Sequence, residues 1–167
     1  MLRLLERQIK KDEFSEAHTV KCHVIMFGHR NFLILGGDSP ADIKSLTEAG
    51  YELDHCRFGF KQGIDANGKV TTSVYSGMIE VALSQLPLEP VIEWALNSRK
   101  YVDGVIVTLD ADNIPVEKVF FKNAACTGFN IDYTLSDKSY ITTKLEISAE
   151  QLIVGSDISF QNKWIYD

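Results

Sequence analysis

Histidine and cysteine are the side chains in this sequence whose types are best suited to chemistry. A cysteine beside a histidine can become a nucleophilic thiolate, because the imidazole accepts the thiol proton. The chain has four histidines and three cysteines, namely His18, His23, His29, His55, Cys22, Cys56 and Cys126. None of them lies in a turn motif typical of a catalytic nucleophile. The sequence therefore predicts no catalytic residue and no enzyme.

The same residue types could instead bind a metal ion. Two adjacent pairs, Cys22 with His23 and His55 with Cys56, would supply four zinc ligands if their strands lay side by side. Neighbouring side chains on a strand point to opposite faces, so each pair would direct only one ligand toward the ion. The cysteines are widely spaced and form no CxxC pair, which favours reduced thiols buried as small hydrophobic groups. We expect no metal and no other cofactor.

Residues 110–113, with the sequence Asp-Ala-Asp-Asn, resemble the start of a calcium-binding loop, in which carboxylates at alternate positions converge on the ion. Ile114 and Pro115 then occupy positions that need an oxygen ligand and a glycine. A polar hairpin turn explains the segment better. Phosphate-binding loops are not indicated either, because Gly36 and Gly37 are not followed by the lysine that such a loop requires.

Length and charge narrow the function classes. With 167 residues, 45% of them hydrophobic, the chain is long enough for one well-buried core and is expected to form one domain. The 17 basic and 23 acidic residues leave a net charge of -6, which argues against binding to nucleic-acid phosphates. The apolar runs are far shorter than the roughly 20 residues that cross a bilayer, and the first apolar residues are too few for a signal peptide. We expect a protein that starts in the cytoplasm and has no membrane span.

The first third of the chain predicts two short helices and a hairpin. Apolar residues at helical spacing indicate an amphipathic helix within residues 1–18. Residues 24–27 and 32–35 are apolar runs separated by a glycine-containing loop, which is typical of a β-hairpin. A second helix is expected over about residues 39–49, because Pro40 is tolerated in a first helical turn.

The middle of the chain predicts two strands, a loop and the best helix. Mixed polarity over residues 51–61 indicates a strand with neighbours on both faces. Residues 63–68 form a loop that ends in Asn-Gly, a favoured tight turn. Strict alternation over residues 68–80 indicates another long strand. Apolar residues at spacings of three and four predict the main helix, over about residues 87–98.

Strand patterns fill the remainder of the chain. They cover residues 103–110, 116–123, 126–137 and 140–148, followed by short apolar segments at 151–155 and 160–166. Six or more antiparallel strands with one central helix imply an antiparallel β-barrel or β-sandwich that the helix flanks. The predicted fold class is mainly β, with an N-terminal extension and a short inserted helix.

Four segments follow one another in an order that is typical of one family. They are the Val-Tyr-x-Gly strand of residues 68–79, the helix of residues 94–98 that closes in Asn-Ser, the Ile-Ser-Ala strand of residues 146–152, and the tail Asn162-Lys163-Trp164. In this order they resemble the tube protein of type VI secretion systems, Hcp or TssD, in the form found in Bacteroidota. The similarity runs from about Lys21 to Trp164.

This resemblance implies a barrel domain over residues 19–167, preceded by an extension over residues 1–18, and no catalysis. It implies that six copies close into a ring and that rings stack into a hollow tube. A contractile sheath then expels the tube with its spike and effector proteins, without a signal peptide. The resemblance also implies that the loop of residues 62–70 reaches a neighbouring copy, as the corresponding loop does in the family. The candidate self-assembly residues are Ile64, Asp65, Asn67, Gly68, Lys69 and Val70, with Trp164 in the tail.

Two segments depart from the family pattern. Residues 1–18 precede its usual first strand, and residues 36–50 insert a helix where the family passes almost directly from strand to strand. Either segment could obstruct ring stacking or line the pore. Two other functions remain open: the inner tube of a phage-tail-like extracellular injection system, and a monomeric β-sandwich adaptor that binds effector or partner proteins.

Overall fold

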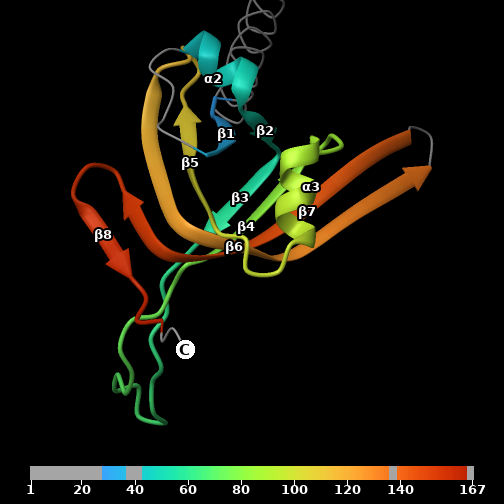
Figure 1. Cartoon of the computed structure of the whole chain (residues 1–167). Helices are drawn as coiled ribbons and strands as arrows, with labels where there is room; N and C mark the ends of the chain where they lie inside the picture. Colours follow the sequence, from blue (N-terminus) through green and yellow to red (C-terminus); the bar gives the residue numbers. More distant parts are fainter. Residues whose placement is uncertain (1–27, 37–42, 136–138, 165–167) are drawn as a thin grey trace, which may run out of the picture.

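A computed structural model describes residues 28–36, 43–135 and 139–164 of the chain. In this part, antiparallel strands form one sheet that curls into a barrel, with two helices outside it (Figure 1). The elements are β1 (Arg30–Leu35), α2 (Ile43–Ala49), β2 (Tyr51–Leu53), β3 (His55–Phe58), β4 (Met78–Leu83), α3 (Glu89–Leu96), β5 (Val102–Leu109), β6 (Pro115–Leu135), β7 (Ser139–Val154) and β8 (Ile158–Gln161). The predicted mainly β fold with a flanking helix is confirmed, whereas the helix predicted within residues 1–18 lies outside the described residues.

The barrel closes where the chain passes from β2 directly into β3, because these two strands pair with opposite edges of the sheet. The order of the strands is β2-β1-β5-β6-β7-β4-β3, and β8 pairs with β7 beside this path. Only Asp54 separates β2, at one edge, from β3, at the other edge. The Asp54 N–H donates to the carbonyl of Ala82 in β4 at 2.8 Å, and its carboxylate accepts a hydrogen bond from Ser84. The chain around Asp54 therefore joins the two edges of the sheet.

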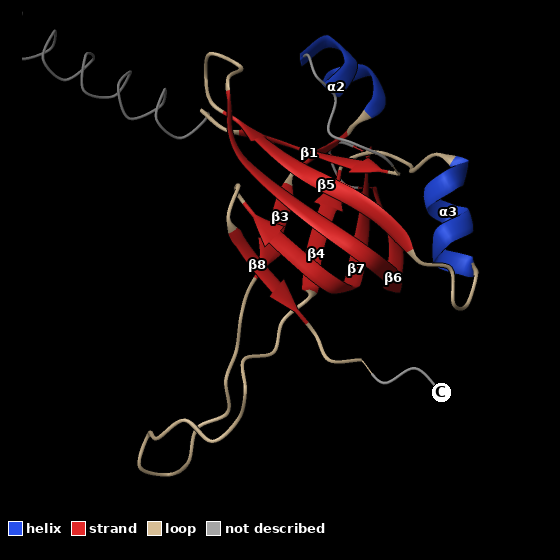
Figure 2. Cartoon of the chain, turned by 60° about the vertical axis from the view of Figure 1, so that its left-hand side comes forward, coloured by secondary structure: helices blue, strands red, loops and turns tan. Residues whose placement is uncertain are grey.

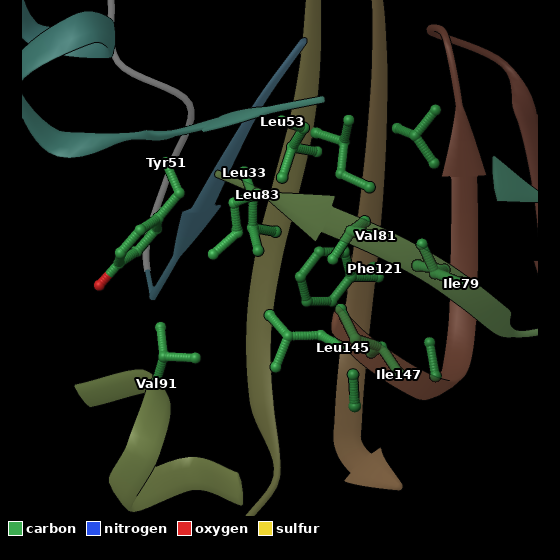
Figure 3. Packing of buried hydrophobic residues seen from close by; sticks show 14 of the residues in the cluster. Leu33, Tyr51, Leu53, Ile79, Val81, Leu83, Val91, Phe121, Leu145 and Ile147 are labelled. Carbon is green, nitrogen blue, oxygen red and sulfur yellow. The ribbon is translucent and has the colours of Figure 1, made fainter. Parts of the chain in front are cut away.

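The main core lies inside the barrel, where side chains from different strands meet (Figure 3). Ile79 of β4, Phe121 of β6 and Ile147 of β7 are each 0% exposed. In β7 the inward Leu145 and Ile147 alternate with the exposed Lys144 and Glu146, as the half-exposed strand pattern predicts. Burial of these apolar side chains is the main term that stabilises the barrel.

A second, smaller cluster lies on the outer face of β1 and β5, beneath α2. Phe32 and Ile34 of β1 pack with Val105 and Val107 of β5 and with Leu46 of α2. Both faces of these two strands are therefore covered, which explains why their apolar residues are consecutive rather than alternating. The short inserted helix α2 serves here as a cover for the sheet.

Helix α3 packs against the side of the barrel, beside β6 (Figure 2). Its residues Val91 and Trp94 are buried. The indole Nε1–H of Trp94 donates to the carbonyls of Lys100 and Ala124, at 3.1 and 3.2 Å. Trp94 thus joins the helix, the loop that follows it and β6, because a buried indole N–H needs a hydrogen-bond partner.

Several predicted strands differ from the observed ones. The strand predicted over residues 51–61 is divided at Asp54 into β2 and β3. The two strands predicted over 116–123 and 126–137 form one strand, β6, because Asn123 adopts a φ of 49° and a bulge follows at residues 126–128, so the strand bends without ending. Of the predicted hairpin, residues 24–27 lie outside the described part, and β1 pairs on its two edges with β2 and β5.

The largest correction concerns residues 68–80. Only the last residues of this predicted strand, from Met78 on, belong to an observed strand, because β4 begins at Met78. Residues 68–77 leave the barrel and pair with residues 61–64 at two isolated bridges, Lys61 with Tyr75 and Ile64 with Val70. The alternation in this run is real, but both of its faces are exposed to solvent over residues 68–75.

Candidate self-assembly site

Residues 59–77, which connect β3 to β4, form a long arm that projects away from one end of the barrel (Figure 2). Its two chains are joined by backbone hydrogen bonds between Lys61 and Tyr75, at 2.8 and 2.9 Å, and by one from Thr71 N–H to the Gly63 carbonyl at 2.8 Å. A further bond runs from Gly63 N–H to the Thr72 hydroxyl at 2.6 Å. The arm is therefore an irregular hairpin with internal order, not an unstructured loop.

The tip of the arm is a turn organised by Asp65. The Asp65 carboxylate accepts hydrogen bonds from the N–H groups of Asn67 and Lys69, each at 2.9 Å. The Gly68 N–H donates to the Asp65 carbonyl at 3.0 Å, and Asp65 N–H donates to the Lys69 carbonyl at 2.9 Å. Gly68 has a φ of 83°. This pattern is the three-residue hairpin loop with a glycine in the left-handed region, instead of the two-residue Asn-Gly turn that the sequence favours.

The same turn occurs at residues 110–114, whose sequence resembles the start of a calcium-binding loop. The Asp110 carboxylate accepts hydrogen bonds from the N–H groups of Asp112 and Ile114, at 2.9 and 2.8 Å, and Asn113 has a φ of 60°. The carboxylate is thus used by the backbone of its own turn. The preferred interpretation, a polar hairpin turn, is confirmed.

Large apolar side chains are exposed along the arm. Ile64 and Val70 at the tip are 66% and 51% exposed, and Phe60, Val74 and Tyr75 nearer the barrel are also exposed. Exposed apolar side chains gathered on one projecting element are typical of an interaction surface, whereas isolated ones are normal on a monomer. The arm thus has the composition of a protein-binding element.

The root of the arm is held by the last residues of the described chain. The Asn162 side-chain amide donates to the carbonyls of Ser76 and Ala149, at 2.7 and 2.9 Å. Gly77 has a φ of 97°, and its carbonyl accepts a hydrogen bond from Ala149 N–H at 2.8 Å. The rings of Phe60 and Phe160 meet edge to face, with centroids 5.5 Å apart. The root is therefore fixed to both β7 and the segment after β8.

Six of the seven candidate residues lie together, and one does not. Ile64, Asp65, Asn67, Gly68, Lys69 and Val70 form the arm tip. Trp164 lies apart, half-buried, with its ring centroid 6.0 Å from that of Tyr101, in the segment before β5. Sequence reasoning did not select Phe60, Val74, Tyr75 or Asn162. The signal for Val74 and Tyr75 lies in the alternation of residues 68–80, which predicts a strand of the sheet. Phe60 and Asn162 lie outside that run.

The histidines and cysteines in the described part of the chain do not belong to a metal-binding cluster. His18, His23 and Cys22 lie outside it, and within it no three metal-ligating side chains cluster. Burial, aided by the nearby Glu117 carboxylate, raises the pKa of the Cys56 thiol to about 11. Burial also raises the pKa of Cys126. Both thiols are therefore protonated at neutral pH, which agrees with their interpretation as small hydrophobic groups.

None of the helices described here has the length and hydrophobicity that crossing a membrane requires.

Comparison with known proteins finds a matching family and several solved structures with the same fold. The family model described as hemolysin coregulated protein Hcp (TssD) matches residues 27–165. No curated protein sequence matches the chain. Among solved structures, Hcp1 from Flavobacterium johnsoniae superposes with a TM-score of 0.66 and 20% identity, covering 79% of this chain and 98% of that one. Hcp1 from Salmonella typhimurium superposes with a TM-score of 0.59 and 16% identity, covering 80% of this chain and 93% of that one.

These structures show a shared fold, and the family model adds the sequence pattern over most of the chain. The resemblance inferred from the four ordered segments is confirmed. Members of this family are structural, secreted components of type VI secretion systems. The chain belongs to the Hcp (TssD) family, the tube subunits of type VI secretion systems.

Proposed function

We propose that this subunit forms a homohexameric ring, and that rings stack through the arm of residues 59–77 into a tube that carries effector proteins. The observation that supports this assembly most directly is the arm itself. It is ordered by internal hydrogen bonds, carries exposed apolar side chains at its tip, and projects beyond the barrel. Such an element buries its apolar surface only when a second molecule covers it.

A second copy of the same chain fits the charge of the arm. The arm contains two lysines, Lys61 and Lys69, and one aspartate, Asp65, whereas the whole chain has a net charge of -6. The carboxylate of Asp65 is engaged by the backbone of the turn. The arm as a whole therefore carries one net positive charge. A cationic arm is attracted to an acidic copy, and such complementarity favours association in one orientation. Head-to-tail contacts of this kind are heterologous, so they continue along a stack.

The remaining roles follow from membership in the family. We propose that the subunit is made in the cytoplasm and leaves through the contractile apparatus, in contact with sheath, spike and effector proteins. We also propose that residues 1–18 are an extension outside the ring-forming domain of residues 19–167. The family match, which begins at residue 27, supports this division.

The mass of the purified protein in solution tests the ring. We expect a species near six times 18.8 kDa by light scattering, with ring-shaped particles in electron micrographs. A monomer whose mass does not change with concentration would overturn the ring and would favour the monomeric adaptor. The barrel fold would not be affected by that outcome.

Charge reversal at the arm tip tests the role of the arm. Lys69→Glu with Val70→Glu places two carboxylates where a cation and an apolar side chain meet the partner. We expect a loss of about 2–4 kcal/mol of association free energy, or a roughly 30- to 1,000-fold rise in the dissociation constant. Sedimentation velocity measures the loss of the assembled species, and circular dichroism should not change.

A matched control keeps the same two substitutions away from the arm. Val116→Glu with Lys122→Glu changes an equally exposed valine and an exposed lysine on β6; Val116 is 54% exposed and Val70 is 51% exposed. If the control pair weakens assembly as much as the arm pair, general charge repulsion explains the effect and the arm has no special role. Assembly unaltered by the arm pair would remove the tip from the interface.

A further inference from the structure

The direction of the arm depends on a small set of contacts at its root. Along the chain, the arm meets the barrel at residues 59 and 77, and both positions are glycines. The Ser76 hydroxyl donates to the Gly59 carbonyl at 2.5 Å, which ties the two chains of the arm to each other at this point. That bond does not tie the arm to the barrel. Two flexible residues at the root would let an internally ordered hairpin swing as a unit.

Asn162 supplies a connection between the arm and the barrel. One of its amide hydrogens binds the Ser76 carbonyl in the arm and the other binds the Ala149 carbonyl in β7, at 2.7 and 2.9 Å. Its backbone N–H donates to the Glu150 carbonyl at 2.8 Å, so the residue is itself anchored to β7. A carboxamide is well suited to this position, because its NH₂ group offers two donors to two carbonyl acceptors. The opposite orientation of the amide would place its oxygen against both carbonyls.

An aromatic contact near Asn162 also joins the arm to the C-terminal segment. Phe160 of β8 packs edge to face against Phe60 on the first chain of the arm, with centroids 5.5 Å apart. The C-terminal segment therefore contacts both chains of the arm, one through Phe60 and the other through Ser76. Each such contact is modest, of the order of 1 kcal/mol. Together they remove the rotation that the two root glycines permit.

We propose that residues 160–162 are a clamp that sets the direction of the arm, and that Asn162 is a positioning residue for self-assembly. This inference rests on the proposed role of the arm as an interface. An arm held in one direction has lost its orientational freedom before it meets a partner, so less entropy is lost on association. The clamp therefore contributes to assembly although none of its residues is at the arm tip.

The test combines Asn162→Asp with amide hydrogen exchange. Aspartate has the same shape, but its carboxylate faces the Ser76 and Ala149 carbonyls without a donor. Exchange of the Ala149 N–H reports the root directly, because this group donates to the Gly77 carbonyl. We expect it to exchange at least about 10-fold faster in the variant, while the core amides of β7 keep their protection, and we expect the dissociation constant of the assembly to rise about 10-fold or more.

Two further variants make the result decisive. Asn162→Ala removes the donors without adding charge and replaces Asn162→Asp if that variant does not fold. Asn97→Asp is the matched control, since the Asn97 amide also donates to a carbonyl, that of Glu93 at 2.7 Å, but at the end of α3. Faster exchange at Ala149 together with weaker assembly, seen only at position 162, supports the clamp.

Three results would overturn the clamp. They are unchanged exchange at Ala149, faster exchange throughout the barrel as expected of a general stabilising residue, and faster exchange at the root with unchanged assembly. If the unmodified protein is a monomer, the proposed ring is wrong. The exchange of Ala149 then still decides whether Asn162 holds the arm, so the two proposals fail separately.

Discussion

Replacing Trp94 with alanine should lower the free energy of unfolding by about 3–5 kcal/mol, the usual cost of removing a buried tryptophan. Trp94 of α3 is 1% exposed and packs toward β6, where its indole N–H reaches the Ala124 carbonyl. The substitution leaves a cavity and also leaves the Lys100 and Ala124 carbonyls without the indole donor. Urea denaturation followed by circular dichroism measures the loss.

The second tryptophan of the chain is a matched control. Trp164 is half-buried, and its ring contacts that of Tyr101 at a centroid distance of 6.0 Å. Loss of such an aromatic pair costs about 0.5–1.5 kcal/mol beyond area burial. We therefore expect Trp164→Ala to be much milder than Trp94→Ala. Equal losses in the two variants would contradict the view that Trp94 is the anchor of α3.

Gly77→Ala should destabilise the protein and disturb the arm at the same time. A Cβ at this position would lie 2.2 Å from the Ala149 carbonyl oxygen and 2.6 Å from the Asn162 side-chain nitrogen. Relief of that overlap costs about 1–3 kcal/mol, and the φ of 97° adds about 1–2 kcal/mol for any residue with a Cβ. Since the backbone at the root must shift, we expect weaker assembly as well as a lower midpoint of thermal unfolding.

Alanine substitutions at two other glycines of the arm distinguish the cost of steric overlap from the cost of the backbone conformation. Gly68 has a φ of 83° but open space around its Cβ position, so Gly68→Ala should cost only the backbone term. Gly59 has open space and its φ lies outside the left-handed region, so Gly59→Ala should be nearly neutral in stability. The expected order of destabilisation is Gly77, then Gly68, then Gly59. If thermal unfolding shows that Gly77→Ala is not the most destabilising of the three, the contact with Ala149 is not the dominant cost.

Local patterns in the sequence predicted the elements whose conformation is decided by near neighbours. The alternation around Leu145 and Ile147 identified β7, because one face of that strand is buried and the other is not. The turn at Asp110 was identified from residues whose side chains bind their own backbone. The family resemblance came from the order of short segments and agrees with the family match over residues 27–165.

Patterns that depend on distant partners were misinterpreted. Val70 and Val74 alternate with polar residues as in a half-buried strand, yet both are exposed on the arm. Alternation states which side chains share a face, but not what covers that face. The break at Asp54 had no local signal either, because the strand changes partners there to reach Ala82 of β4.

Composition, periodicity and the order of motifs thus predicted the strand-rich fold, the main helix, the hydrophobic role of Cys56 and Cys126, and the family. The arm of residues 59–77 and its hydrogen bond to Asn162 are evident only in the folded barrel. The physical reason is the separation along the chain: the hydrogen bond from Asn162 to Ser76 joins residues 86 positions apart. Contacts of that range depend on how the whole barrel closes, and no local pattern encodes them.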